Sequence, residues 1–243
     1  MIFIDTFLLF LTLLSSSPSE PNPYDECVQP YNMDLRIRAC TQIIERSGID
    51  QGNLGSAYNS RGQARRAFGE MDRANADFKS AIAMLDEFIR LYPEDSIAYL
   101  ERGISYRNLN HLNRAIADYD EAIRISPNFA LAFNNRCWAR AVSNSELDKA
   151  RADCDAALKL EGNDPNTLDS RGLVGLKQGK YAEAWADYDA ALRVVPSAAG
   201  YRYGRGIAAL RLGRIEEGNA DLQEALRIDV NIGKVFLDYG VRR

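Results

Sequence analysis

The chain has 243 residues, of which 46% are hydrophobic and 26% charged, and these values are ordinary for a protein that buries a core. Its formal net charge of −4 argues against nucleic acid as the main partner, because phosphate binding requires a basic surface. With one histidine, His111, the chain lacks the usual material for acid–base catalysis or metal binding, so we expect no enzymatic activity, no metal and no cofactor.

The first 18 residues are expected to form an export signal. An eight-residue apolar run, Phe7–Leu14, precedes three serines and Pro18. This length suits a signal-peptide core and is too short to span a bilayer. The segment before the run carries Asp5 and no Lys or Arg, and the alternatives are an apolar N-terminus or a wrongly chosen start codon. We expect an exported protein, in the bacterial periplasm or secreted, with no membrane span once the leader is removed.

Next in the chain come an expected linker, residues 19–32, and an expected N-terminal capping helix, residues 33–54. The sequence of residues 33–46, MDLRIRACTQIIER, resembles the second helix of a helix hairpin that has no first helix. Such a segment would cover the exposed end of a repeat array, whose core is otherwise open to solvent.

The four cysteines form two local pairs, Cys27 with Cys40 and Cys137 with Cys154. Neither pair is a Cys-x-x-Cys, and histidines are too few to complete a zinc site. For an exported chain we expect two disulfides, one that holds the linker to the capping helix and one that joins the two helices of a hairpin. In a cytosolic chain the same residues would be four reduced thiols in the core.

From residue 55 onward, an arginine followed by a small residue recurs at spacings of 41, 34, 35 and 34 residues, at Arg61-Gly62, Arg102-Gly103, Arg136-Cys137, Arg171-Gly172 and Arg205-Gly206. After Gly103, small residues follow at Ala115 and Ala122, an aromatic at Tyr119 and a proline at Pro127. Small residues let two antiparallel helices approach, and a proline marks a helix boundary. The pattern predicts five helix hairpins and a C-terminal capping helix, at residues 55–95, 96–129, 130–164, 165–198, 199–232 and 233–243. Seven extra residues in the first unit would lengthen its second helix by about two turns.

This pattern resembles the tetratricopeptide repeat over roughly residues 55–243, and the composition resembles that of exported bacterial proteins of this family. The resemblance implies an all-α, right-handed solenoid of stacked antiparallel helix hairpins that binds proteins or peptides in a concave groove.

In this family the first helices line the groove. We call the small residue of each arginine–small-residue pair the marker position, and the arginine before it the marker arginine. The side chains three residues before and one residue after each marker position are therefore expected to face the groove: Asn59, Gln63, Leu100, Ile104, Asn134, Trp138, Asp169, Leu173, Tyr203 and Ile207. Members that grip chaperone carboxylates use lysines here, and this chain has none at these ten positions, so that activity is not expected. Trp138 and Tyr203 are the expected anchors, because large aromatics dominate binding energies. The alternative is that these residues pack between helices or that a capping helix fills the groove.

Each marker arginine is followed by an aspartate on the second helix of its hairpin, at Asp77, Asp118, Asp153, Asp187 and Asp221. We expect each arginine to pair with this aspartate and so to orient the two helices. Asp-x-Asp patterns at residues 118/120, 153/155 and 187/189 do not predict calcium, because carboxylates two residues apart on a helix diverge.

The sequence thus predicts an exported scaffold or adaptor that binds a protein or peptide partner without catalysis. The alternative function is a self-associating structural module of a cell-envelope assembly.

Overall fold

The computed structural model describes residues 23–28 and 32–243, and the predicted export signal lies outside these residues. The described part of the chain forms helices and no strands, which confirms the all-α solenoid. The helices are α1 Pro23–Val28, α2 Met33–Glu45, α3 Gln51–Ala67, α4 Met71–Leu91, α5 Ser96–Asn108, α6 Leu112–Ile125, α7 Ala130–Val142, α8 Leu147–Glu161, α9 Pro165–Gln178, α10 Tyr181–Val194, α11 Ala199–Arg211, α12 Ile215–Ile228 and α13 Ile232–Asp238.

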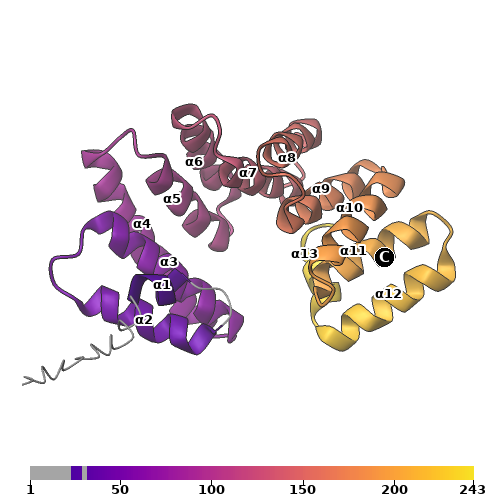
Figure 1. Cartoon of the computed structure of the whole chain (residues 1–243), viewed down its shortest axis with the longest axis horizontal. Helices are drawn as coiled ribbons and strands as arrows, with labels where there is room; N and C mark the ends of the chain where they lie inside the picture. The colour runs from indigo at the N-terminus through magenta and orange to yellow at the C-terminus, as the bar shows by residue number, and fades with distance from the viewer. Residues whose placement is uncertain (1–22, 29–31) are drawn as a thin grey trace, which may run out of the picture.

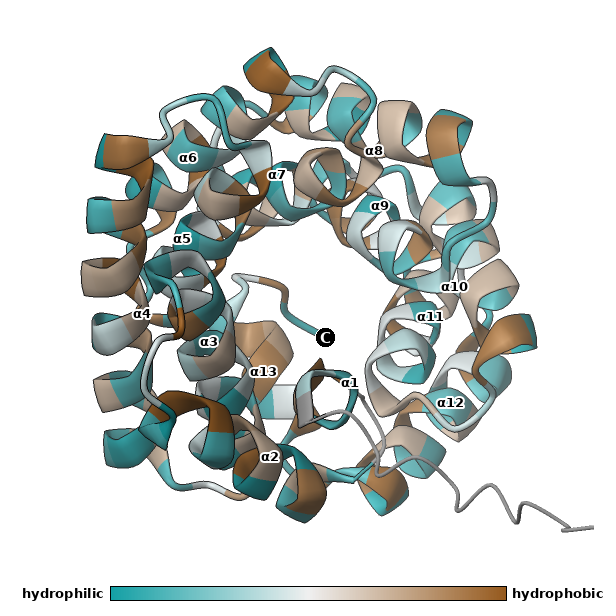
Figure 2. Cartoon of the chain, turned by 60° about the vertical axis from the view of Figure 1, so that its left-hand side comes forward, coloured by the Kyte–Doolittle hydropathy of each residue, from teal (hydrophilic) through white to brown (hydrophobic). Residues whose placement is uncertain are grey.

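Ten of these helices form five hairpins, from α3–α4 to α11–α12, which follow one another around a curved array (Figure 1). The first helices, α3, α5, α7, α9 and α11, line the inside of the curve, and the second helices form the outer layer (Figure 2). The inner helices therefore supply the concave face. None of the described helices is long and apolar enough to cross a membrane.

The marker glycines make room for the large side chain of the second helix. A Cβ atom on Gly103 would lie 2.5 Å from the ring of Tyr119, and one on Gly172 would lie 2.8 Å from Tyr188. Both rings are fully buried, so these glycines let the two helices of a hairpin close over an aromatic core residue.

The third hairpin fills the same two positions with a disulfide. Cys137 replaces the glycine and Cys154 the aromatic, and the two are bonded with their Cα atoms 5.5 Å apart. A second disulfide joins Cys27 of α1 to Cys40 of α2, at the N-terminal end of the array. These are the two pairings expected from the sequence.

The predicted Arg–Asp pairing is confirmed in all five hairpins. In the second hairpin, the Arg102 guanidinium donates to both carboxylate oxygens of Asp118, at 3.0 and 2.6 Å. The same arginine also donates to Asp86 of the preceding outer helix, at 2.8 Å. Each of these arginines therefore fastens its own hairpin and, from the second hairpin onward, also fastens that hairpin to the one before.

This double pairing explains the Asp-x-Asp patterns. Asp118 accepts from Arg102 of its own hairpin, whereas Asp120 accepts from Arg136 of the next hairpin at 2.6 Å. The carboxylates diverge around the helix and serve two different arginines. The later junctions repeat the arrangement, with Arg171 to Asp155 at 2.8 Å and Arg205 to Asp189 at 2.7 Å.

The first hairpin departs from the others in length. Helix α4 has 21 residues, against 14 in α6. Because seven residues make about two helical turns, the insertion preserves the rotational register, and Asp86 still stands sixteen residues before Arg102. The ion pair between an inner-helix arginine and an aspartate of the preceding outer helix, which we call the clamp, is therefore kept between the first two hairpins despite the longer helix.

Candidate functional site

Trp138 stands at the middle of the concave face, on α7. The Arg107 guanidinium of α5 lies over its ring, 5.3 Å from the centroid. Tyr239, which follows α13, meets the same indole in a T-shaped contact with centroids 5.5 Å apart. Arg107 is held in place by a 2.9 Å hydrogen bond that it donates to Asn135. The half-buried tryptophan is thus packed between a cation and an aromatic ring.

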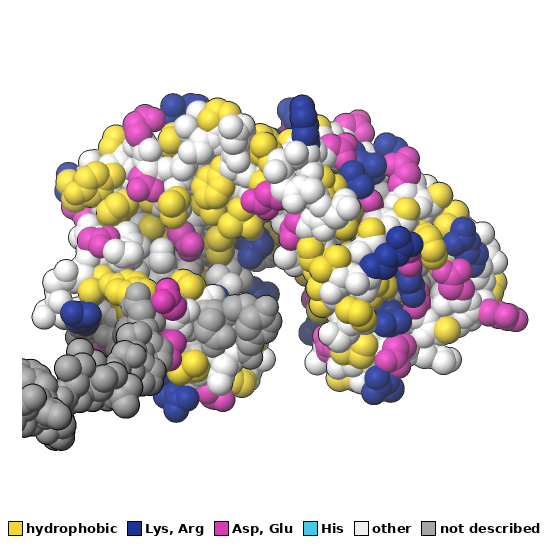
Figure 3. Space-filling model, viewed as in Figure 1, with side chains coloured by type: hydrophobic (Ala, Val, Ile, Leu, Met, Phe, Trp, Pro, Cys, Tyr) yellow, Lys and Arg dark blue, Asp and Glu magenta, His cyan; other side chains and the backbone are white. Residues whose placement is uncertain are grey.

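On one side of Trp138 the groove opens into a cavity of about 490 Å³. Helices α3, α5, α7 and α9 all contribute to its wall, and the lining includes Gln63, Ile104, Arg107, Asn134, Trp138 and Asp169. Most of the lining is amide, carboxylate or guanidinium, so this part of the groove is suited to hydrogen bonding. Figure 3 shows the hollow between the N-terminal and C-terminal hairpins.

Two groups in this cavity lack partners. The Asn134 Oδ1 atom is buried and accepts no hydrogen bond from the described residues. Asp169 is half-buried and makes no hydrogen bond or ion pair within the described ranges. Because polar groups removed from water normally find partners, this wall is left with unused hydrogen-bonding capacity.

Burial raises the pKa of the Asp169 carboxyl to about 7. Its neighbours are the phenols of Tyr188, Tyr201 and Tyr239, which offer it no positive charge. The carboxyl is therefore costly to ionise in this groove, and a hydrogen-bond donor or a cation brought to it would lower that cost.

On the other side of Trp138 a second opening of about 780 Å³ separates the inner helices from α13. It is lined by Arg66, Arg107, Asn108, Asn110, Trp138, Val142, Val235, Asp238 and Tyr239. The Trp138–Tyr239 contact therefore divides the concave face into two openings.

The C-terminal half of the groove is closed by α13. Phe236 is buried and packs on Tyr203 of α11 with ring centroids 5.0 Å apart. A Cβ atom on Gly233 would lie 3.1 Å from the Tyr203 hydroxyl, so the α13 backbone runs directly against this side chain. In Figure 2, α13 lies inside the ring of hairpins.

The structure distributes the ten expected groove residues over three environments. Five line the open cavity: Gln63, Ile104, Asn134, Trp138 and Asp169. Leu173, Tyr203 and Ile207 are buried in a hydrophobic cluster that includes Ile232 and Phe236 of α13. Asn59 and Leu100 are buried between neighbouring helices.

Asn59 shows why position alone does not place a side chain in the groove. Its amide nitrogen donates to the backbone oxygen and to the carboxylate of Glu101, at 2.7 Å each. Its amide oxygen accepts a hydrogen bond from Ser105. This buried amide therefore joins α3 to α5, with both of its N–H donors engaged between the two helices.

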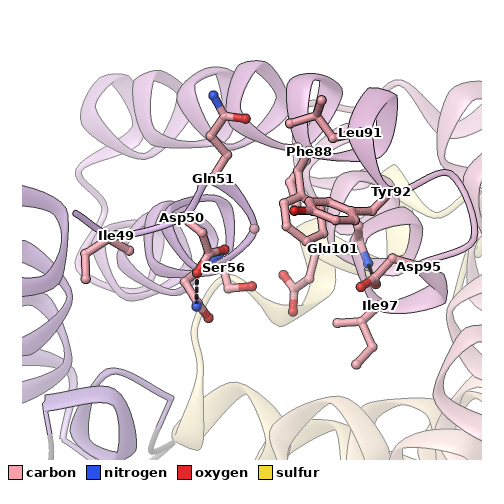
Figure 4. Close-up of a pocket in the computed structure, with 14 residues that line it drawn as sticks. Ile49, Asp50, Gln51, Ser56, Phe88, Leu91, Tyr92, Asp95, Ile97 and Glu101 are labelled. Atoms are coloured by element: carbon pink, nitrogen blue, oxygen red, sulfur yellow. Dashed lines mark hydrogen bonds between the residues drawn. The ribbon is translucent and has the colours of Figure 1, made fainter.

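A separate cavity of about 730 Å³ lies at the N-terminal edge, beside the long α4 (Figure 4). Phe88 and Leu91 of α4 and the following Tyr92 form an apolar wall, and the Glu101 carboxylate points into the space. Burial raises the pKa of Glu101. The end of the long α4 thus supplies part of the wall of this cavity.

Comparison with known proteins agrees with the repeated helix hairpins described above. A family model described as tetratricopeptide repeat matches residues 67–130 and 170–229, just over half of the chain. FlbA of Caulobacter vibrioides is 30% identical over 109 residues, which are 43% of this chain and 18% of FlbA. The TPR repeat-containing protein PA4667 of Pseudomonas aeruginosa is 30% identical over 110 residues, which are 45% of this chain and 19% of that protein. The matched region thus spans less than a fifth of either relative.

Among solved structures, the thermophilic TPR protein TTC0263 of Thermus thermophilus has a TM-score of 0.58 at 17% identity, covering 76% of this chain and 97% of that one. MamA of Desulfovibrio magneticus RS-1 has a TM-score of 0.57 at 16% identity, covering 75% and 97%. YrrB, described as a TPR protein with an unusual peptide-binding site, has a TM-score of 0.50 at 20% identity, covering 80% and 94%. These likenesses concern the fold.

Proposed function

This chain belongs to the tetratricopeptide repeat family, and from that premise we propose that it is an exported, non-catalytic scaffold or adaptor. Its concave face binds a segment of another protein, and the contact is centred on the cavity beside Trp138.

The observation that carries this proposal is a buried amide oxygen without a hydrogen-bond partner and a half-buried carboxyl beside an aromatic anchor. Asn134 Oδ1 and the Asp169 carboxyl both line the cavity that Trp138 borders. A polypeptide segment supplies backbone N–H donors for such groups and apolar side chains for the indole. Its binding would recover hydrogen bonds that are unmade in the free protein.

Export is supported by the two disulfides together with the apolar leader read from the sequence. Disulfides persist in oxidising compartments and are rare where thiols are kept reduced. The similarity in fold to the solved structure of YrrB, a TPR protein with an unusual peptide-binding site, supports a peptide-type ligand.

Site-specific photo-crosslinking in the source organism tests the proposal. A photoreactive residue replaces Leu131, which lines the cavity and is 46% exposed. The matched control replaces Ile215, which is 56% exposed on the outer helix α12. A discrete crosslinked protein at position 131 that is absent at position 215 supports the groove. Equal labelling at both positions contradicts it, and a crosslink between two copies of the chain would favour a self-associating module instead.

A further inference from the structure

The clamp that fastens consecutive hairpins is missing at the C-terminal end. At the other junctions an arginine binds an aspartate that stands sixteen residues earlier on the preceding outer helix, as in Arg205 with Asp189. The next repeat step would place this pair at positions 239 and 223. Tyr239 and Gln223 occupy these positions, so no ion pair can form there.

Among the residues that the structure describes, helix α13 has no such ion pair to the preceding outer helix, and it lies across the concave face. Tyr239 contacts Trp138 of α7, although α9 and α11 come between them in the order of inner helices. Phe236 contacts Tyr203. The segment therefore occupies the surface that the family fold leaves for a ligand.

Helix α13 presents a coherent apolar face to the groove. Ile232, Val235, Phe236 and Tyr239 stand at positions i, i+3, i+4 and i+7, the spacing of one helical face. These four residues line or fill the surface opposite Trp138 and Leu173, whereas Leu237 points away and is 59% exposed. The groove thus accepts an amphipathic helix through two aromatic side chains about one turn apart.

The packing of α13 in the groove does not provide hydrogen-bond partners for the polar groups Asp169 and Tyr188. A residual cavity of about 80 Å³ is lined by Asp169, Tyr188 and the α13 side chains. The Tyr188 hydroxyl is buried and has no hydrogen-bond partner in the described part of the chain. With seven residues, α13 is also too short to be a stable helix alone, so its order depends on these contacts.

We propose that α13 is an internal stand-in for the partner, and that the groove binds a short amphipathic helix that carries two aromatic residues one turn apart and displaces α13. This inference rests on the proposed function, because it names the chemistry of the partner for the same groove.

The test uses the full chain with Trp185→Phe, which leaves Trp138 as the single tryptophan. In this background, Phe236→Ala/Tyr239→Ala should undock α13, so that acrylamide quenches Trp138 more strongly and its emission shifts to longer wavelength. The control, Leu237→Ala, changes an exposed residue of the same helix and should leave both signals unchanged. Circular dichroism checks that each variant keeps its helical content.

The probe is a synthetic peptide of residues 230–243. Added to the undocked variant, it should restore the protection of Trp138, whereas the same peptide with both aromatics changed to Ala should not. The chain that keeps its own aromatics should not respond, because a tethered segment competes at an effective concentration of about millimolar.

Two results would overturn the inference: unchanged quenching after the double substitution, or a folded, undocked variant that the aromatic peptide fails to protect. Either result leaves the proposed function standing if Leu131 still crosslinks to a partner. If Leu131 gives no crosslink but the peptide still protects Trp138, the proposed function is contradicted. The result would still show that the groove surface binds a helix.

Discussion

The aromatic rings of Trp138 and Tyr239 meet in a T-shaped contact, 5.5 Å between centroids and at an interplanar angle of 88°, across the concave face. One residue belongs to the third hairpin and the other follows the last helix. The contact shows that α13 and the residue after it fold back over the groove.

Restoring the missing clamp should withdraw α13 from the groove. Gln223→Asp/Tyr239→Arg recreates the pair that joins consecutive hairpins elsewhere and removes the ring that contacts Trp138. We expect the emission of Trp138 to shift to longer wavelength, measured with Trp185→Phe. Tyr239→Arg alone removes the same ring without completing the ion pair, and the same spectrum for this variant and the double variant would count against a role for the clamp.

Loss of a clamp arginine should destabilise the fold far more than loss of an exposed one. Arg102 pairs with the buried Asp118, so Arg102→Ala leaves an uncompensated carboxylate and should cost about 3 kcal/mol of unfolding free energy. Arg124 pairs with Glu121 at the surface, where water screens the pair, so Arg124→Ala should change the free energy of unfolding far less. Urea unfolding measures both, and equal effects would refute the structural role of the Arg102–Asp118 pair.

The disulfide inside the third hairpin should matter more to global stability than the one at the N-terminus. Cys137→Ala/Cys154→Ala opens a loop between core helices and should lower the free energy of unfolding by about 3 kcal/mol on the chain-entropy model. Cys27→Ala/Cys40→Ala should chiefly free α1, which lies at the end of the array. A thermal melt compares the two variants, and a larger loss from the N-terminal pair would contradict the assignment.

Asp169 should make stability fall as pH rises. The unfolded chain releases this proton near pH 4, about the ordinary value for aspartate, whereas the folded chain holds it until about pH 7. Between these values the folded state binds more protons, so its free energy of unfolding declines with increasing pH and levels off above. Asp169→Asn should flatten this interval relative to the parent.

Urea midpoints across the same pH range provide the measurement. Asp72→Asn, at an exposed position on α4 away from the groove, is the comparison substitution. Parallel curves for Asp169→Asn would show that this carboxyl does not titrate in the groove as described.

The repeated architecture is predictable because the marker residues perform the same physical task in every unit. Gly103 and Tyr119 can be matched from spacing alone, since the small residue has to admit the large one. The Cys137–Cys154 pair occupies the corresponding positions and is equally visible. The arginine of each marker likewise points to an aspartate at a constant distance along the chain.

Details of the groove depend on contacts that spacing does not encode. Asn59 occupies a groove position in the pattern, yet Glu101 and Ser105 take up its hydrogen-bonding groups. The position of α13 across the groove follows from tertiary packing, although Tyr239 in place of arginine was a readable sign that the stack changes there. The cavity beside α4 depends on how the two extra turns pack, which the repeat pattern does not describe.

The most direct test of the central claim uses the two tryptophans as a matched pair. Trp138 stands in the groove, whereas Trp185 lies on α10 and donates to Glu217 on the outer layer. Against the partner identified by crosslinking, Trp138→Ala should weaken binding by about 30-fold, the effect of removing an aromatic hot spot, while Trp185→Ala should not change it. Equal affinity of the folded Trp138→Ala variant and the parent would contradict binding in the concave groove.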